Sequence, residues 1–261
     1  MKLALILAMA ALLNPMTLVT PGTERELVLP QAADHAGVIS LGQAVDPQTG
    51  VVVDGYALIK RREAAKPAHA GGGGGTTTSS CYAFMARGAS WKSVEPWVIN
   101  STNNSGLDSA WVLQNFTQSI DKWEAAAGLD ILGLGTETPA LLEADTVAPD
   151  GANEVLFGSI ADPGVIGVTI VWGVFGGPMQ NRMLTEWDQA YDQVDFSWSA
   201  IGEAGKMDFE NISTHELGHT IGLTHPADSC SQETMYRYAD YGETIRRDLN
   251  AGDIAGAAAL Y

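Results

Sequence analysis

The alternation of apolar and polar side chains predicts one long helix and several strands in the last two thirds of the chain. Within residues 107–127, apolar side chains recur at spacings of four, four, three and four, which places Val112, Phe116, Ile120, Trp123 and Ala127 on one helical face. Gly128 follows and can close this helix. Apolar runs predict strands at 96–100, 153–157, 165–172 and 194–198. Residues 165–172 are nearly all apolar and rich in β-branched side chains, so this strand is expected to be central.

The first eighty residues differ from the rest in composition. Residues 1–20 begin with Met1-Lys2 and a run of eleven apolar residues, which is too short for a membrane span and typical of a signal peptide. An uncleaved N-terminal anchor is the alternative. Residues 21–70 predict two short strands, at 37–41 and 51–59, around a turn at 46–50. This segment is a candidate propeptide, or else a disordered spacer.

A linker and a single domain follow. Residues 71–80 consist of Gly, Thr and Ser, which is the composition of a flexible linker. The basic triplet Lys60-Arg61-Arg62 precedes it and is a candidate site for a processing protease. Residues 81–261 are numerous enough for one domain with a sizeable core.

The net charge of −17 lies entirely on residues 81–261. Residues 1–80 carry six basic and six acidic side chains, whereas residues 81–261 carry eight basic and 25 acidic ones. Such a domain should repel nucleic acid and anionic lipid, so neither is expected as a partner beyond the N-terminal anchor. Nothing in the pattern indicates an oligomeric state.

Three histidines and a glutamate lie together near residue 220. His215 and His219 are four residues apart, so on a helix they lie one turn apart on the same face. Gly222 can adopt φ > 0 and turn the chain back, which would bring His225 to the same point. Three neutral imidazoles can hold one zinc ion and leave a fourth position open for water, as catalytic zinc sites do. Glu216 can then reach that water without binding the metal. A coincidental group of surface histidines is the alternative.

The resemblance to metzincin metalloproteases extends beyond these histidines. Met235 lies about ten residues after His225, as the methionine of the family's Met-turn does. Residues 249–261 resemble the last helix of matrixins, with Asn250 and Asp253 suited to N-cap and N3. Pro226 and residues 220–223 are more similar to serralysins. The chain is therefore identified as matrixin-like with some serralysin-like features.

The resemblance implies a fold and an activity. The fold would be an α/β (α+β) metzincin-type zincin catalytic domain, with a mixed twisted sheet, two long helices and a C-terminal helix. The activity would be that of an exported zinc-dependent endopeptidase, with His215, His219 and His225 as zinc ligands and Glu216 as general base. A peptide or protein substrate would lie extended along an edge strand, with an S1′ pocket between the zinc helix and residues 235–241. The alternatives are a non-catalytic secreted binding protein that retains the fold, and a zinc hydrolase of non-peptide substrates.

Two cysteines and several acidic residues complete the expectations. An even pair in an exported chain favours a disulfide between Cys81 and Cys230. A zinc-binding cysteine switch at Cys81, or two unpaired thiols, are the alternatives. No further histidines occur in residues 81–261, so one zinc is expected. Calcium is an open expectation, because solvated acidic side chains explain its candidate ligands equally well; these are Asp145, Asp150, Asn153, Glu154 and Asp195.

Overall fold

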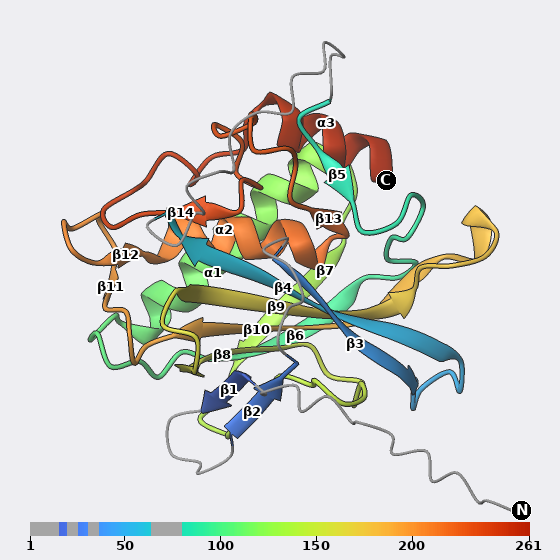
Figure 1. The fold of residues 1–261 in the computed structure, drawn as a ribbon, viewed down its shortest axis with the longest axis horizontal. Helices are drawn as coiled ribbons and strands as arrows, with labels where there is room; N and C mark the ends of the chain where they lie inside the picture. The colour runs from blue at the N-terminus through green and yellow to red at the C-terminus, as the bar shows by residue number, and fades with distance from the viewer. Residues whose placement is uncertain (1–15, 20–25, 31–36, 64–79) are drawn as a thin grey trace, which may run out of the picture.

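A mixed sheet forms the centre of the computed structural model, which describes residues 16–19, 26–30, 37–63 and 80–261. Among these residues the sheet has ten strands (Figure 1). They are β1 (Met16–Val19), β2 (Glu26–Leu29), β3 (Val38–Val45), β4 (Val52–Arg62), β6 (Glu95–Asn100), β7 (Leu132–Glu137), β8 (Glu154–Ile160), β9 (Val165–Val174), β10 (Met183–Asp192) and β14 (Tyr238–Ala239). Two short ladders stand apart from the sheet: β5 (Ala83–Phe84) pairs with β13 (Leu223–Thr224), and β11 (Trp198–Ser199) pairs with β12 (Met207–Asp208).

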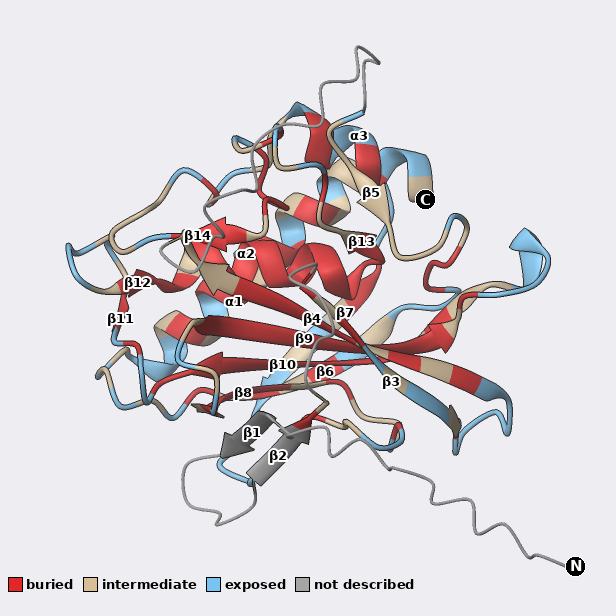
Figure 2. Ribbon diagram, in the orientation of Figure 1, coloured by how far each residue is buried: buried red, intermediate tan, exposed pale blue. Residues whose placement is uncertain are grey.

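Strand β9 lies inside the sheet, between β4 and β10, and runs antiparallel to both. On the far side of β10, the strands β8, β6 and β7 follow in parallel. All residues of β9 except the last are buried, so the expectation of a central apolar strand is confirmed. Figure 2 shows this buried band running through the middle of the sheet and into the helix above it.

Three α-helices in the described part of the chain lie on one face of the sheet (Figure 1). They are α1 (Ser109–Ala127), α2 (Phe209–Thr220) and α3 (Ala251–Leu260), and a short 3-10 turn covers Met179–Asn181. Helix α1 begins where Asp108 accepts the N–H of Trp111 and ends at Gly128, which has φ +70°. The expected helix and its buried apolar stripe are confirmed, although Ala127 is only half-buried. The expected mixed sheet with two long helices and a C-terminal helix is also confirmed.

The hairpin β3–β4 is part of the main sheet. Strand β4 pairs with β9 from Asp54 opposite Gly173 to Arg61 opposite Val165. The expected strands at 37–41 and 51–59 are thus present as β3 and β4. The segment expected as a possible propeptide, residues 21–70, therefore contributes β2, β3 and β4 to the main sheet. The Gly-rich segment at 71–80 lies outside the described residues, except for Ser80.

The other expected strands have a mixed outcome. Strands β6, β8 and β9 confirm those at 96–100, 153–157 and 165–172. The strand expected at 194–198 is wrong, because only Trp198 is in a strand there. The sheet instead uses β10, which the apolar pattern does not reveal because Glu186, Asp188, Gln189 and Asp192 are polar and buried within it.

No helix in the described ranges is both long enough and apolar enough to cross a bilayer. The signal peptide or anchor expected at residues 1–20 lies outside the described residues, apart from Met16–Val19, which form β1.

Candidate metal centre

Helix α2, which carries the first two histidines, has defined signals at both ends. Asp208 precedes it, and its side chain accepts the N–H of Asn211 at 3.0 Å. Just beyond its end, Gly222 has φ +102°, and a Cβ atom at this position would lie 2.9 Å from the carbonyl oxygen of Ala89. Only glycine fits this turn, so the expected role of Gly222 is confirmed.

The turn brings the three histidines together. The ring centroid of His219 lies 4.7 Å from that of His215 and 4.7 Å from that of His225, and the remaining pair is 5.3 Å apart. His215 and His219 are wholly buried, whereas His225 is half-buried. Burial lowers the pKa of His219 to about 3 and that of His215 well below its ordinary value, so both rings are neutral.

Backbone carbonyls engage Nδ1 of each buried histidine, and one nitrogen from each of the three rings lies within 4.8 Å of the other two. Nδ1 of His215 lies 2.6 Å from the carbonyl oxygen of Thr234, and Nδ1 of His219 lies 2.9 Å from that of Leu223. A neutral ring that donates from Nδ1 offers Nε2 as a metal ligand. Nε2 of His215 is buried with no hydrogen-bond partner in the described residues, and Nε2 of His219 lies 3.1 Å from Nε2 of His225. This donor set fits a zinc ion.

Glu216 lies beside the histidines and is wholly buried. Its Oε2 accepts a hydrogen bond of 2.6 Å from the hydroxyl of Thr169 on β9, whereas its Oε1 is buried with no hydrogen-bond partner among the described residues. Burial raises the pKa of Glu216 to about 8, although Thr169 and then Lys60 act to lower it. The sequence did not indicate Thr169, because a threonine within a buried strand carries no signal of its own.

The methionine expected below the histidines lies directly against α2. Met235 is buried, and its Sδ would be only 2.1 Å from a Cβ atom added at Gly218. Gly218 is the residue before His219 in the helix. The absence of a side chain at this position therefore lets Met235 pack directly against the turn of the helix that carries His219.

Helix α3 holds the methionine segment in place through one carboxylate. Asp253 accepts the N–H of Asn250 at 2.9 Å, which confirms the expected helix start. The same wholly buried carboxylate accepts the N–H of Thr234 at 2.7 Å and that of Met235 at 3.1 Å. This link between α3 and the Met235 segment was not predicted from the sequence.

A disulfide joins Cys81 and Cys230, which lie 149 residues apart. The expected pairing is confirmed, and it leaves no thiol at Cys81 for a zinc switch. The bond ties the segment before β5 to the loop that follows His225.

A second group of potential metal ligands lies on the sheet, away from the histidines. Oxygen atoms of Asp145, Glu186 and Asp188 lie within 4.8 Å of one another. Burial, followed by nearby carboxylates, raises the pKa of Asp145 to about 6 and that of Asp188 well above its ordinary value. Burial is also the main cause that raises the pKa of Glu154 to about 7 and that of Glu186 to about 8.

The expected calcium ligands only partly coincide with this group. Asp145 belongs to it, and Asp150 and Glu154 raise the pKa of its members. The amide of Asn153 is used elsewhere, since it donates to Pro96 O and accepts from the N–H of Trp187. Asp195 lies in the loop after β10 beside Asp192. Glu186 and Asp188 were missed because β10 was missed, although two acidic residues two apart in a strand share one face.

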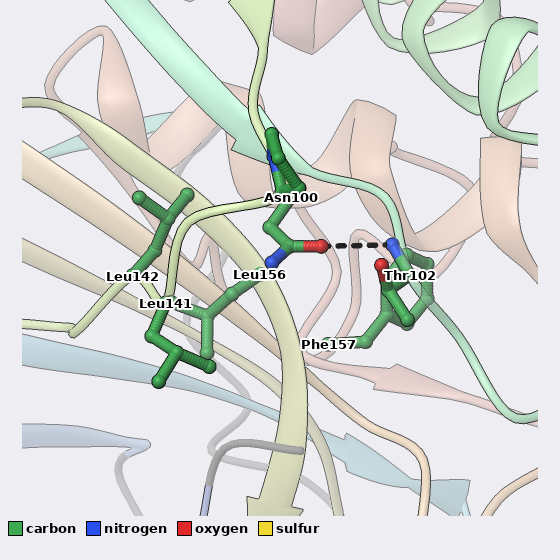
Figure 3. Close-up of a pocket in the computed structure, with 7 residues that line it drawn as sticks. Asn100, Thr102, Leu141, Leu142, Leu156 and Phe157 are labelled. Atoms are coloured by element: carbon green, nitrogen blue, oxygen red, sulfur yellow. Dashed lines mark hydrogen bonds between the residues drawn. The ribbon is translucent and has the colours of Figure 1, made fainter. Parts of the chain in front are cut away.

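A shallow pocket elsewhere has no feature of a catalytic site. It has a volume of about 170 Å³ and is lined mainly by apolar residues, among them Leu141, Leu142 and Leu156 (Figure 3). Asn100, its main polar group, accepts the N–H of Thr102 and donates to Ala140 O. Its amide is therefore already engaged, and the histidine cluster remains the stronger candidate.

Comparison with known families agrees with this geometry. A comparison with curated proteins finds no significant match. The sequence profile described as matrixin matches residues 95–261, which include the helix α1, the strands β6 to β10, the three histidines, Met235 and helix α3. This match covers more than half of the chain, and the chain therefore belongs to the matrixin family of zinc metallopeptidases.

Proposed function

We propose that this chain is an exported zinc endopeptidase in which His215, His219 and His225 hold the metal and Glu216 is the general base. The observation that carries the proposal is the convergence of three imidazoles beside a buried carboxylate. A binding protein that had lost turnover would be expected to lack a ligand or the carboxylate, and neither is missing. Peptides or proteins are the proposed substrates.

The roles of the side chains follow from their contacts. When bound, zinc would polarise the scissile carbonyl and lower the pKa of a bound water. Glu216 has one oxygen held by Thr169 and the other without a hydrogen-bond partner in the described residues. That second oxygen would accept the proton of the attacking water and later deliver it to the leaving amine. Thr169 would keep the carboxylate oriented, and the carbonyls of Thr234 and Leu223 would fix the two buried imidazoles.

Metal analysis and one substitution test this proposal on the full chain. We expect about one equivalent of zinc in the purified protein, and a large loss of zinc in His219→Ala. Glu216→Gln should keep the zinc but lose peptide hydrolysis by about a hundredfold or more, because the amide cannot take a proton. Full zinc occupancy in His219→Ala, or normal turnover in zinc-loaded Glu216→Gln, would exclude the assignment.

Export and processing belong to the same proposal. The apolar start of the chain supports a signal peptide at residues 1–20, and the Cys81–Cys230 disulfide supports an oxidising compartment. Residues 21–70 would be a propeptide, 71–80 a linker and 81–261 the catalytic domain. Sequencing the N-terminus of secreted material would test these boundaries.

We also propose that calcium binds at Asp145, Glu186 and Asp188. Glu186 is almost fully buried, and its Oε1, like Oδ2 of Asp145, has no hydrogen-bond partner within the described ranges. Such carboxylate oxygens are the ligands that calcium prefers, and a cation would offset the cost of burying them. Calcium should raise the melting temperature of the full chain by a few degrees, whereas Glu186→Gln should abolish this increase. An equal shift in both proteins would show that calcium binds elsewhere.

A further inference from the structure

One buried polar side chain on β10 has no role in the proposed mechanism. Gln189 is wholly buried, and its neighbours on the same face of the strand, Trp187 and Tyr191, belong to the hydrophobic core. A buried amide is costly unless it is hydrogen-bonded, and an apolar side chain would fill the same space at a lower cost. The reason for a glutamine at this position must therefore lie in its contacts.

Gln189 links the core to the end of helix α2. Its Nε2 donates to Oγ1 of Thr220 at 2.8 Å, and its Oε1 accepts from the hydroxyl of Tyr191 at 2.5 Å. Thr220 is the last residue of α2, and its own hydroxyl donates to the carbonyl oxygen of Glu216 at 3.5 Å. All four residues are wholly buried. A directed chain of hydrogen bonds thus runs from Tyr191 to the backbone of the proposed general base.

Two neighbouring side chains of the sheet hold α2 at two points. Thr169 on β9 and Gln189 on β10 lie directly opposite each other in the strand pairing, and α2 packs on both strands (Figure 1). Thr169 donates to the carboxylate of Glu216, and Gln189 donates to the hydroxyl of Thr220. Residues 216 and 220 are four apart, so they lie one turn apart on one helical face. Two such contacts restrict both rotation of α2 about its axis and sliding along the sheet.

The turn that carries His219 depends on contacts of this kind because it is the last turn of α2. The final carbonyl groups of a helix have no partner within it. Here the carbonyl oxygen of Thr220 accepts from Nε1 of Trp91 at 2.8 Å, and that of Ile221 accepts from the hydroxyl of Tyr261 at 3.0 Å. The contacts that hold the end of the helix therefore also set the position of a candidate metal ligand.

We propose that Gln189 is a positioning residue of the peptidase. Supported by Tyr191, it holds the last turn of α2, so that Glu216 and His219 keep their places relative to the sheet. Gln189 acts through Thr220 and is not itself a catalytic group. Such placement matters because a displacement of about 1 Å can lower the rate of an enzyme about a hundredfold. This inference rests on the proposed function, because positioning has a meaning only for a site that turns over.

A purely structural role is the alternative, and two substitutions separate it from positioning. Gln189→Met leaves the hydroxyl of Tyr191 without its acceptor, whereas Tyr191→Phe leaves Oε1 of Gln189 without its donor. Each single variant thus buries one unpaired polar group. The double variant Gln189→Met/Tyr191→Phe buries neither and should recover stability, although it still lacks the bond to Thr220.

Thermal unfolding and peptide hydrolysis by the full-length, zinc-loaded chain should therefore rank these variants differently. The melting temperature should fall by about 3–6 °C in each single variant and return to within about 2 °C of the wild type in the double variant. The kcat should fall about tenfold in Gln189→Met and in the double variant, and by less in Tyr191→Phe, which keeps the donor to Thr220. The KM should stay within about twofold, because a wholly buried Gln189 offers the substrate no contact.

Hydrogen exchange gives a measure that needs neither metal nor turnover. The N–H groups of Ile221 and Gly222 donate to Leu217 O at 3.1 Å and to His219 O at 2.9 Å. In the metal-free protein, both should exchange about tenfold faster in the two variants that lack Gln189 than in the wild type. Tyr191→Phe should show a smaller increase.

Two further comparisons complete the experiment. Thr220→Ser keeps the hydroxyl that Gln189 binds, so it should retain more kcat than Thr220→Val, which keeps only the shape of the side chain. Ser101→Ala is the matched control, because it removes a buried hydroxyl whose partner, Glu137, lies on β7. Its kcat and its exchange at residues 221 and 222 should equal those of the wild type.

The possible failures can be told apart. A double variant with the kcat of the wild type, or kcat values that simply follow the melting temperatures, would overturn the positioning role and leave the peptidase intact. A zinc-loaded wild type without peptide hydrolysis would overturn the proposed function and the positioning role with it. If Gln189→Met does not fold, the double variant and the comparison of Thr220→Val with Thr220→Ser decide the matter.

Discussion

Replacing Gly218 by alanine should destabilise the protein, although the same change stabilises an ordinary helix. At an exposed helical position, Gly→Ala stabilises by about 1 kcal/mol. Here the new Cβ would lie 2.1 Å from Sδ of Met235 and 2.7 Å from Cζ2 of Trp123, and both side chains are buried. Such overpacking costs about 1–3 kcal/mol. We therefore expect a net loss of about 1–2 kcal/mol in the free energy of unfolding, together with weaker zinc binding at the adjacent His219.

Urea unfolding of the full chain measures this loss, and a double-mutant cycle assigns it to Met235. Met235→Ala alone should cost about 2–5 kcal/mol through the cavity that it leaves. The double variant Gly218→Ala/Met235→Ala should lose less than the sum of the single losses, by about 0.5–3 kcal/mol, because the new methyl group enters the vacated space. Gly176→Ala is the control, since no atom lies within 4 Å of its added Cβ. A stabilising Gly218→Ala would refute the argument that the contact with Met235 requires glycine.

Two further predictions concern single contacts. Thr169→Val keeps the shape of the side chain but removes the hydroxyl that donates to Glu216. We expect kcat for a peptide substrate to fall about tenfold with unchanged zinc content, because a hydrogen bond to a charged group of about 1.5 kcal/mol is lost. An unchanged kcat would show that Glu216 does not depend on this hydroxyl. Replacing Cys81 and Cys230 by serine should lower the free energy of unfolding by about 5 kcal/mol in the chain-entropy model, because the disulfide closes a loop of 149 residues. Thiol alkylation of the native protein should not raise its activity, and an increase would instead indicate a cysteine switch.

The sequence predicts the candidate metal ligands better than it predicts their surroundings. His215, His219 and His225 are recognisable because their spacing suits one helical turn and one glycine turn, both of which are local features. The hydroxyl of Thr169 lies 47 residues away in sequence, and only the pairing of β9 with its neighbours brings it to Glu216. Long-range contacts of this kind leave no periodic signal in the chain.

Strands with buried polar groups are a second reason why the prediction of strands from the sequence fails. Strand β10 places Glu186 and Asp188 in the interior, so it does not have the apolar pattern by which strands are recognised. The hairpin β3–β4 is the opposite case, because its strands were expected but its partner was not. Alternation reveals that a segment is a strand, whereas the partner depends on which sheet edge is free in the folded molecule.

The groups that orient the candidate metal centre come from several elements of the fold. Glu216 receives its hydrogen bond from Thr169 on β9, and the imidazoles are oriented by the carbonyls of Thr234 and Leu223. Strand β4 adds one contact to this set, because Nζ of Lys60 lies 3.1 Å from Nδ1 of His215 and donates to Tyr236 O. Glu216 and His219 thus take their orienting hydrogen bonds from outside β4, whereas Nδ1 of His215 has both the carbonyl oxygen of Thr234 and the ammonium group of Lys60 within hydrogen-bonding distance.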